Sequence, residues 1–471
     1  MENTSLNFSI TETFVEEQFK TNILPGISEF IRIDNLSPNY DPEWNTNGKQ
    51  EKAAQFLLNW ALSQGVRGIK GEMIKAKERT PIIFFEVEAN GSGKNIFMYG
   101  HFDKQPHFSG WAEGLGPCLP VIRGDNLYGR GGADDGYAIF SSIASIKAIQ
   151  EQGKTHGRIT ILIEGSEESG SPDLIPYIND LKERIGTPDL VVCLDSGCLD
   201  YNTLWITTSL RGVVNVDIKI DVLEEAVHSG VGTGICPDSL MILRSLLERI
   251  EDSKTGRVHE DFHVQIPQGR IEEMKSVGEE MKEGVIKFKL KPGVKPLSDD
   301  YAEIIANNVW RPTITVTGAS GFPAHKTAGN VLRASTEVRL SMRLPPTKNA
   351  KEAETQLIQK LTENPPFNAP IQVSGGHAGS GWNANVFSEK LDKCLERASQ
   401  NAFGKKVMKF GEGGSIPFIK SLGDFFPQCE ILVLGVLGPN SNAHSVNEAL
   451  NIPYTKKITS IIAHVLNEYS N

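Results

Sequence analysis

The sequence predicts an α/β fold in which a mixed, mostly parallel sheet is flanked by helices, with an inserted α+β domain that carries an antiparallel sheet. Two continuous apolar runs, 158–164 and 190–194, are typical of buried parallel strands. Two strictly alternating runs, 214–221 and 336–343, are typical of strands with one wet face. The length of 471 residues also favours more than one domain.

The alternating pattern of apolar and polar residues begins near residue 209 and ends near residue 385. We therefore predict a catalytic domain in two parts, 1–208 and 386–471, interrupted by an inserted lid and dimerisation domain, 209–385. The second part of the catalytic domain is expected to supply a helix at 386–402, a buried strand at 430–436 and a last helix at 453–469.

The first domain opens with helical spacing of apolar residues over 12–33 and 50–64. A strand is expected at 81–88 and another at 95–99, and the glycine-rich segment 89–94 lies between them. This segment lacks the spacing of a phosphate-binding loop, and it joins two strands rather than a strand and a helix. We therefore predict a hairpin turn there.

Further helices are expected from periodicity on both sides of the proposed boundary. The first follows a glycine cluster in the catalytic domain, and the others belong to the inserted domain: 137–152, 239–250, 272–283 and 350–361.

Composition narrows the class of protein. The net charge is −10 and no block of Lys or Arg occurs, which argues against nucleic acid or an anionic membrane as a partner. The first ten residues lack a basic and apolar signal pattern, and no apolar run is long enough to span a bilayer, so we expect a cytoplasmic protein. Six scattered cysteines without a Cys-x-x-Cys pair indicate reduced thiols.

His101 and Asp103 stand at the predicted end of the 95–99 strand. Residues two apart in an extended segment point the same way, so the two side chains can share one face. The pair is typical of a metal-binding imidazole beside an orienting carboxylate. Taken by itself, such a pattern is more often an ordinary surface pair than a metal site.

Other acids and one imidazole follow predicted strands or open helices. Asp134 and its neighbour Asp135 precede a helix, where an N-cap is the alternative explanation. Glu167 and Glu168 follow a buried strand, where two carboxylates are costly without a nearby positive charge. Since ligands of open α/β sheets bind beyond the carboxyl ends of strands, we expect one site there. Its candidate members are His101, Asp134, Glu167, Glu168, Asp195 and His444.

This set is rich in oxygen, contains two imidazoles and has no sulfur. Such donors suit zinc, cobalt or manganese. A pair of ions needs one bridging carboxylate, terminal ligands for each ion and a base for the bridging water, and the set provides these with one acid left over.

Other histidines are not assigned to a metal. His259 and His263 match H-E-x-x-H, but Gly256 and Pro267 interrupt the helix that zinc chemistry of this type requires, so a surface segment is expected. Four more have no ligand partner at usable spacing: His107, His156, His325 and His464.

Six segments in order resemble the signatures of the dinuclear zinc exopeptidases, the family of carnosinase, cytosolic non-specific dipeptidase, aminoacylase, carboxypeptidase G and succinyl-diaminopimelate desuccinylase. The segments cover most of the chain, and the carnosinase-like dipeptidases are the most similar group. They are 100–106 (GHFDKQP), 128–135 (YGRGGADD), 164–170 (EGSEESG), 226–230 (AVHSG), 411–417 (GEGGSIP) and 443–448 (AHSVNE).

The resemblance implies a zinc exopeptidase fold and two Zn²⁺ per subunit, for which Mn²⁺ or Co²⁺ can substitute. It implies that His101 and Asp195 hold one ion, that Glu168 and His444 hold the other, and that Asp134 bridges the two ions. It also implies a cis peptide bond between Asp134 and Asp135. It further assigns the general base to Glu167 and oxyanion stabilisation to His228. In dimeric relatives this histidine reaches the partner's site, so we predict a homodimer through the inserted domain.

The resemblance also favours a small peptide substrate. Peptide-cleaving relatives tend to carry Asp at the position of Asp195, and carnosinase-like relatives use the acid at Glu412 to hold a free amino terminus. Arg343 is expected to clamp the substrate carboxylate. The neighbouring polar positions are expected to be Asn330, His377, Gly414 and Ser415.

Two features depart from the family pattern. Gly136 replaces the Lys that usually follows the paired aspartates, and the loop after Pro106 differs from the carnosinase form.

The alternative function is an N-acyl amino acid deacylase with the same ions and base. A catalytically silent zinc-dependent structural protein is a third possibility, which predicts a broken ligand set, yet every ligand is present.

Overall fold

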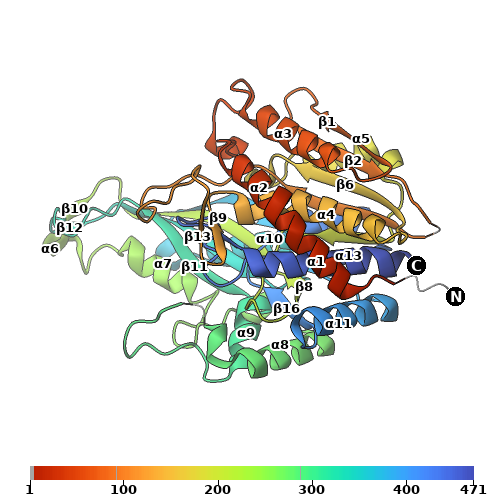
Figure 1. Cartoon of the computed structure of the whole chain (residues 1–471). Coiled ribbons are helices and arrows are strands. Elements are labelled where there is room, and N and C mark those ends of the chain that lie inside the picture. Colours follow the sequence, from red (N-terminus) through yellow and green to blue (C-terminus); the bar gives the residue numbers. More distant parts are fainter. Residues whose placement is uncertain (1–4, 92, 287) are drawn as a thin grey trace. The chain divides into compact units, whose positions relative to one another are not determined.

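The computed structural model describes residues 5–91, 93–286 and 288–471, and it divides into two compact units (Figure 1). The first unit comprises Met1–Thr207, Ala384–Lys409 and Ser421–Asn471, and the second comprises Thr208–Asn383 and Phe410–Lys420. The segment Phe410–Lys420 was assigned to the catalytic domain by the sequence prediction, whereas it packs with the second unit.

The first unit is built on a mixed sheet with four parallel strands at its centre. The strand order is β1-β2-β6-β3-β7-β17-β8, in which β6, β3, β7 and β17 run parallel and the outer strands run antiparallel to their neighbours. The predicted fold class is confirmed. The strands are β1 (Ile69–Ile74), β2 (Ile82–Val87), β6 (Arg158–Glu164), β3 (Asn95–His101), β7 (Leu190–Cys193), β17 (Glu430–Val433) and β8 (Trp205–Leu210).

The predicted hairpin between β2 and β3 is wrong. Strand β6 lies between them, antiparallel to β2 and parallel to β3. A glycine-rich connection cannot reveal this arrangement, because a strand that enters the sheet 60 residues later takes the place between the two strands. The segment 89–94 therefore crosses β6 to reach β3 instead of forming a hairpin turn between neighbouring strands.

Helices cover this sheet, and several of them pack on one another. Helix α13 contacts α4, α11 and α1, which lie side by side in Figure 1, while α3 contacts β1 and β2. Helix α13 is largely apolar along its inward positions, and Ile458, Ile461 and Leu466 are fully or almost fully buried. The helices are α1 (Phe8–Gln18), α2 (Leu24–Ile31), α3 (Lys49–Ser63), α4 (Tyr137–Glu151), α5 (Leu174–Ile185), α11 (Glu389–Phe403), α12 (Pro417–Phe425) and α13 (Ile452–Ser470).

The second unit contains an antiparallel sheet in the order β11-β13-β9-β14. Strands β9 (Gly212–Asp221) and β13 (Ser335–Leu344) alternate buried and accessible residues, as the sequence predicts. Strands β11 (Thr313–Ser320) and β14 (Ile371–Gly379) were not predicted, because both are rich in small or polar residues and mostly exposed.

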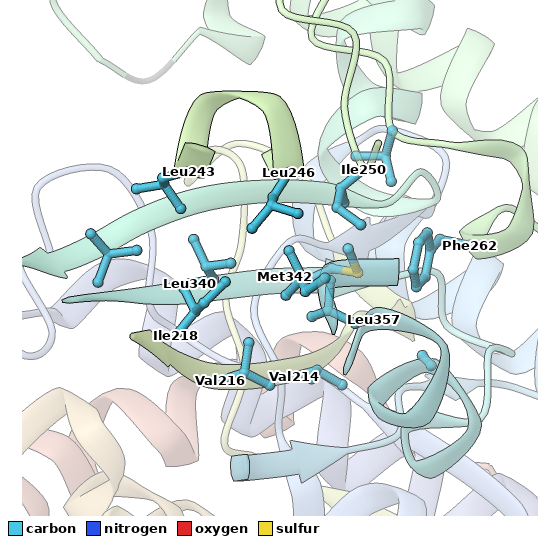
Figure 2. Packing of buried hydrophobic residues seen from close by; sticks show 14 of the residues in the cluster. Val214, Val216, Ile218, Leu243, Leu246, Ile250, Phe262, Leu340, Met342 and Leu357 are labelled. Atoms are coloured by element: carbon cyan, nitrogen blue, oxygen red, sulfur yellow. The ribbon is translucent and has the colours of Figure 1, made fainter. Parts of the chain in front are cut away.

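The buried face of this sheet packs against helices α7 (Ser239–Leu247) and α10 (Ala350–Thr362). Figure 2 shows Val216 and Leu340 from the sheet together with Leu246 and Leu357 from the helices. Burying large aliphatic side chains of this kind contributes about 1.5–3 kcal/mol each. The remaining helices of the unit are α6 (Ser229–Gly232), α8 (Gln268–Met281) and α9 (Tyr301–Val309).

Short strands complete both units. Strands β4 (Val121–Arg123), β5 (Asn126–Tyr128) and β18 (Ala449–Asn451) form a small antiparallel sheet in the first unit. In the second unit, β10 (Val227–His228) pairs with β12 (Val331–Leu332), and β15 (Trp382–Asn383) pairs with the end of β8. Strand β16 (Met408–Glu412) also pairs with β8. Across the described part of the chain, no helix combines the length and apolarity that crossing a membrane requires.

Candidate functional site

Five chain segments bring the predicted metal-binding residues to one edge of the central sheet, and Asp134 comes from the segment that precedes α4. His101 is the last residue of β3, Glu167 and Glu168 form a short 3-10 turn just after β6, and Asp195 follows β7 by two residues. His444 lies in the segment between β17 and β18. The carboxyl ends of parallel strands share one edge of a sheet, which is why residues 343 positions apart can meet there.

The first group of donors is formed by His101, Asp134 and Asp195, all of which are buried. His101 Nε2 lies 3.3 Å from Asp134 Oδ1 and 3.9 Å from Asp195 Oδ2. One donor atom from each residue lies within 4.8 Å of the other two. Three donors at this separation can surround one ion.

The second group is formed by Asp134, Glu168 and His444. His444 Nε2 lies 2.9 Å from Asp134 Oδ2 and 3.2 Å from Glu168 Oε2. The two carboxylates are buried, whereas 56% of the His444 side chain is exposed, so the site opens to solvent on the side of this histidine.

Asp134 belongs to both groups and presents a different carboxylate oxygen to each imidazole. Its peptide bond to Asp135 is cis, as the resemblance implies. The preceding backbone is held by Glu448, whose carboxylate accepts hydrogen bonds from the amides of Gly131, Ala133 and Asp134 at 3.0 to 3.2 Å. The Arg130 guanidinium compensates the charge of Glu448 at 2.8 Å.

Asp103 positions the paired glutamates. Its Oδ1 accepts the backbone amide of Glu167 at 3.1 Å, and its Oδ2 accepts that of Glu168 at 3.0 Å. His101 Nδ1 lies 3.2 Å from the Asp103 backbone oxygen and 3.4 Å from Asp103 Oδ1. Nδ1 can donate to Asp103, which leaves Nε2 directed at the donor groups.

Glu167 stands beside the two groups, with Oε2 4.0 Å from His101 Nε2 and 15% of its side chain exposed. Burial and the nearby Asp195 carboxylate raise the pKa of Glu167 well above its usual range. Burial likewise raises the pKa of Asp195 to about 7. A carboxyl group whose pKa is raised toward neutrality is suited to take and return a proton.

The pKa of the His444 imidazole is raised as well, which favours its charged form. Burial disfavours the charged form of His444, but hydrogen bonds with Asp134 and Glu168 outweigh it and raise the pKa of His444 to about 11. Hydrogen bonds with His101 and His444 lower the pKa of Asp134 despite its burial. The group of acids therefore attracts positive charge strongly, as a cation site must.

One buried oxygen atom in this cluster fits a metal better than a network of hydrogen bonds. Glu168 Oε1 has no hydrogen-bond partner among residues 5–91, 93–286 and 288–471. Buried polar atoms rarely lack a partner, because leaving one unsatisfied costs about 1–3 kcal/mol. The donor set fits a divalent metal.

The sequence analysis missed three supporting residues. Glu448 supports the Asp134 loop as described, Gln105 Nε2 donates to Glu168 Oε2 at 2.5 Å, and Asp135 Oδ2 accepts the backbone amide of His101 at 3.2 Å. All three lie in or next to the motifs already singled out. Their contacts depend on packing between segments, so spacing in the sequence carries no signal for these roles.

Four of the predicted substrate residues gather in the second unit. Arg343 Nη1 donates to Ser415 Oγ at 3.2 Å, and Ser415 Oγ donates to the Arg211 backbone oxygen at 2.5 Å. Gly414 accepts the Arg211 amide at 3.1 Å. His377 pairs with Asn215 on β9, two residues from the row of Arg343, so both side chains lie on the sheet face opposite the core.

The other predicted residues of this unit form a separate group or stand at a strand end. His228 is exposed on β10, and the amide of the next residue, Ser229, donates to the Asn330 backbone oxygen at 2.9 Å. His228 and Asn330 are therefore neighbours on one small ribbon. Glu412 is half-buried and is the last residue of β16.

The H-E-x-x-H segment forms no metal site. His259 and His263 flank a three-residue 3-10 turn, Glu260–Phe262, and not one face of an α-helix. His263 Nε2 lies 2.9 Å from the Val258 backbone oxygen. The sequence spacing of His107 does not reveal its neighbours in the fold, where Asp34 Oδ1 lies 3.1 Å and Cys118 Sγ 3.7 Å from its Nε2 atom.

A mixed α/β sheet with paired donor groups at the carboxyl ends of its parallel strands defines a metal-dependent hydrolase. Comparison of the sequence with known families gives the class: residues 97–468 match peptidase family M20/M25/M40, and the chain belongs to this family. Members of this family use a divalent metal, and the donor groups described above are its candidate binding residues.

Two curated relatives cover most of the chain. The cysteinylglycine-S-conjugate dipeptidase of Corynebacterium striatum is 26% identical over 457 residues, which are 95% of this chain and 94% of that protein. The Cys-Gly metallodipeptidase DUG1 of Saccharomyces cerevisiae is 26% identical over 386 residues, which are 79% of this chain and 78% of that protein.

Solved structures show the same fold. Human carnosine dipeptidase 1 superposes with a TM-score of 0.76 at 20% identity, covering 99% of both chains. The dipeptidase Dug1p of Saccharomyces cerevisiae superposes with a TM-score of 0.76 at 23% identity, covering 98% of both chains.

Proposed function

We propose that this protein is a metallodipeptidase that hydrolyses the peptide bond of dipeptides or short peptides with two zinc ions per subunit. The observation that carries the proposal is the position of Asp134, which offers one oxygen to each of two donor groups. Glu167 lies beside these groups with a raised pKa. The two dipeptidase relatives that cover most of the chain support the same substrate class.

In this proposal, His101 and Asp195 would hold one ion, Glu168 and His444 would hold the other, and Asp134, which belongs to both groups, would serve both. When bound, a pair of zinc ions polarises the scissile carbonyl and lowers the pKa of a shared water molecule. Asp103 keeps Glu167 and Glu168 in place through their backbone amides. Mn²⁺ or Co²⁺ would suit the same oxygen-rich donors.

Glu167 is the general base. Its carboxylate takes a proton from the attacking water and later returns it to the nitrogen of the leaving amine. The raised pKa of Glu167 favours the protonated form, from which the second transfer starts.

Recognition of the two substrate ends is assigned to the second unit. Arg343 would hold the substrate carboxylate through its guanidinium, with Ser415, Gly414, His377 and Asn330 as polar neighbours. The hydrogen bond from Arg343 to Ser415 supports a guanidinium with a defined direction. Glu412 would hold the free amino terminus, which is the group that separates a dipeptide from an N-acyl amino acid.

His228 is proposed to stabilise the oxyanion, and we further propose that it does so across a homodimer formed through the second unit. Its exposed position on the β10 ribbon leaves the imidazole accessible to a second subunit. A cytoplasmic location is proposed as well, because no disulfide joins any of the six cysteines, all of which lie in the described part of the chain, and a reducing compartment preserves thiols.

The test combines metal analysis with a substrate panel. Purified protein would be analysed for bound metal and assayed with Cys-Gly, carnosine and several N-acetyl and N-succinyl amino acids. We expect about two Zn²⁺ per chain and hydrolysis of dipeptides, with Glu167→Ala inactive but still metal-bound. Glu412→Gln should impair dipeptide hydrolysis. Hydrolysis of N-acyl substrates alone, unaffected by Glu412→Gln, would instead establish the deacylase function.

A further inference from the structure

A second cluster of metal-binding side chains lies in the first unit, away from the paired groups. Asp34, His107 and Cys118 each place one donor atom within 4.8 Å of the other two, and all three residues are half-buried. Asp34 lies between α2 and α3, and His107 and Cys118 lie in the long loop between β3 and β4. None of the three belongs to the donor groups around Asp134.

The distances suit a common cation. His107 Nε2 lies 3.1 Å from Asp34 Oδ1 and 3.7 Å from Cys118 Sγ. Zinc bond lengths place tetrahedral nitrogen and oxygen ligands about 3.3 Å apart, and nitrogen and sulfur ligands about 3.6 Å apart. The observed separations therefore leave room for an ion between the atoms with only a small adjustment.

Hydrogen bonding does not satisfy these atoms equally well. Asp34 Oδ1 is buried and has no hydrogen-bond partner within the described ranges, although His107 Nε2 is close. A single proton on Nε2 can serve either the carboxylate or the thiol, and the geometry meets hydrogen-bond criteria only toward Cys118. A cation would satisfy all three donors at once.

The surrounding structure holds Asp34 in a fixed position. Lys49 Nζ donates to Asp34 Oδ2 at 2.6 Å, so the other oxygen is turned toward His107. The adjacent Asn35 side chain donates to the Phe102 backbone oxygen at 2.7 Å. The Ser37 amide donates to the Lys104 backbone oxygen at 2.9 Å, which ties this segment to the strand end before His107.

The two loop residues are anchored as well. The Trp111 indole donates to the His107 backbone oxygen at 2.7 Å, and the Arg130 amide donates to the backbone oxygen of Pro117 at 2.8 Å. The three side chains are thus presented by backbone that is already held in place. A site formed before the ion arrives loses little conformational entropy on binding.

We propose that Asp34, His107 and Cys118 form a separate divalent-cation site that takes Zn²⁺ or Co²⁺. One sulfur, one nitrogen and one oxygen donor match the borderline-soft character of these ions, and exposure leaves a position for water. The positive charges of Lys49 and Lys104 nearby weaken the attraction for a cation. The ion is therefore exchangeable, and it links the β3–β4 loop to the segment after α2.

The experiment uses Co²⁺ as the probe on protein that already carries its ordinary metal complement. A thiolate bound to Co²⁺ gives a charge-transfer absorption in the near ultraviolet, and the donor groups around Asp134 contain no sulfur. We expect this band to grow to one equivalent of Co²⁺ per chain. Cys118→Ser should abolish it, and His107→Asn and Asp34→Asn should each weaken it at least tenfold in Co²⁺ affinity.

Cys236→Ser is the matched control, because Cys236 is the other half-buried cysteine and should leave the band unchanged. Circular dichroism would establish that each variant is folded, and the His107 and Asp34 variants keep the test open if Cys118→Ser does not fold. Absence of the band at saturating Co²⁺, or its persistence in folded Cys118→Ser, would overturn the proposal. Dipeptide hydrolysis by Cys118→Ser should be unchanged, so failure of this site leaves the proposed function standing.

Discussion

Glu448 accepts a hydrogen bond from the backbone amide of Asp134 at 3.2 Å, although 314 residues separate the two positions. The same carboxylate accepts the amides of Gly131 and Ala133 and pairs with Arg130, and it is fully buried. The Asp134 carboxylate, which both donor groups share, is therefore oriented by Glu448, although the Glu448 carboxylate is not itself a candidate metal ligand.

Replacing Glu448 should weaken metal binding and lower the free energy of unfolding together. Glu448→Ala leaves Arg130 buried without its counter-charge and three amides without an acceptor, a change that typically costs about 3–5 kcal/mol. Urea unfolding would measure the loss, and a Zn²⁺ titration would measure the weaker affinity. Glu16→Gln, at an exposed ion pair with Lys456, should change stability by less than about 1 kcal/mol. Unchanged zinc affinity in folded Glu448→Ala would contradict the orienting role.

Asp103→Asn should lower activity without removing the donor atoms themselves. Its carboxylate accepts both Glu167 and Glu168 amides, and an asparagine can accept only one of them while its NH₂ group faces the other. We expect a loss of about 10–100-fold in metal affinity or kcat/KM. Steady-state kinetics with metal titration would measure it, and wild-type values for both quantities would show that this acceptor is dispensable.

Metal binding should stabilise the protein in a way that depends on Asp134 but not on Glu167. Chelator treatment leaves buried carboxylates close together, and restored Zn²⁺ at a thousandfold excess over its Kd would add about 4 kcal/mol of stability. Thermal unfolding with and without Zn²⁺ would measure the gain. Glu167→Gln should retain most of the gain and lose about 10²–10⁴-fold in kcat. Asp134→Asn should lose the gain, and equal stabilisation of both variants would be inconsistent with the assigned roles.

Arg343→Lys should raise KM for dipeptides by about 10-fold or more while kcat changes less, since a lysine cannot form the bidentate contact with a carboxylate. Arg339→Lys is the matched control on the same strand, because Arg339 pairs with Asp217 and is more than half exposed. Steady-state kinetics on both variants would separate the two positions. An equal rise in KM for both would indicate that the effect is not specific to Arg343.

Glu164, the last residue of β6, makes the stability of the protein depend on pH. Burial raises the pKa of Glu164 to about 7, although its carboxylate accepts hydrogen bonds from Tyr99 and Ser171. The unfolded chain releases the Glu164 proton near pH 4.5, whereas the folded protein keeps it up to about pH 7. The free energy of unfolding therefore falls as the pH rises from 4.5 to about 7. In chelator-treated protein, Glu164→Gln should gain up to about 3 kcal/mol relative to wild type between pH 4.5 and pH 8. Urea unfolding at both pH values measures this gain, and parallel pH profiles would refute it.

Several elements followed directly from the sequence. Helix α4, the buried strand β6 and the last helix α13 lie where periodicity places them, because their apolar residues repeat at the spacing that burial requires. Strands β11 and β14 did not follow, since exposed strands of small and polar residues carry little such signal. The hairpin prediction failed because strand order depends on a segment elsewhere in the chain.

The sequence by itself determined which side chains could bind metal and that most of them stand at the end of a strand or the start of a helix, since residue type and periodicity are local properties. Only the tertiary structure decided that Asp134 faces two imidazoles, that Glu448 and Asp103 hold the surrounding backbone, and that Cys118 meets His107. These distances depend on how distant segments pack, and the order of strands in a sheet is set by the energy of the whole core.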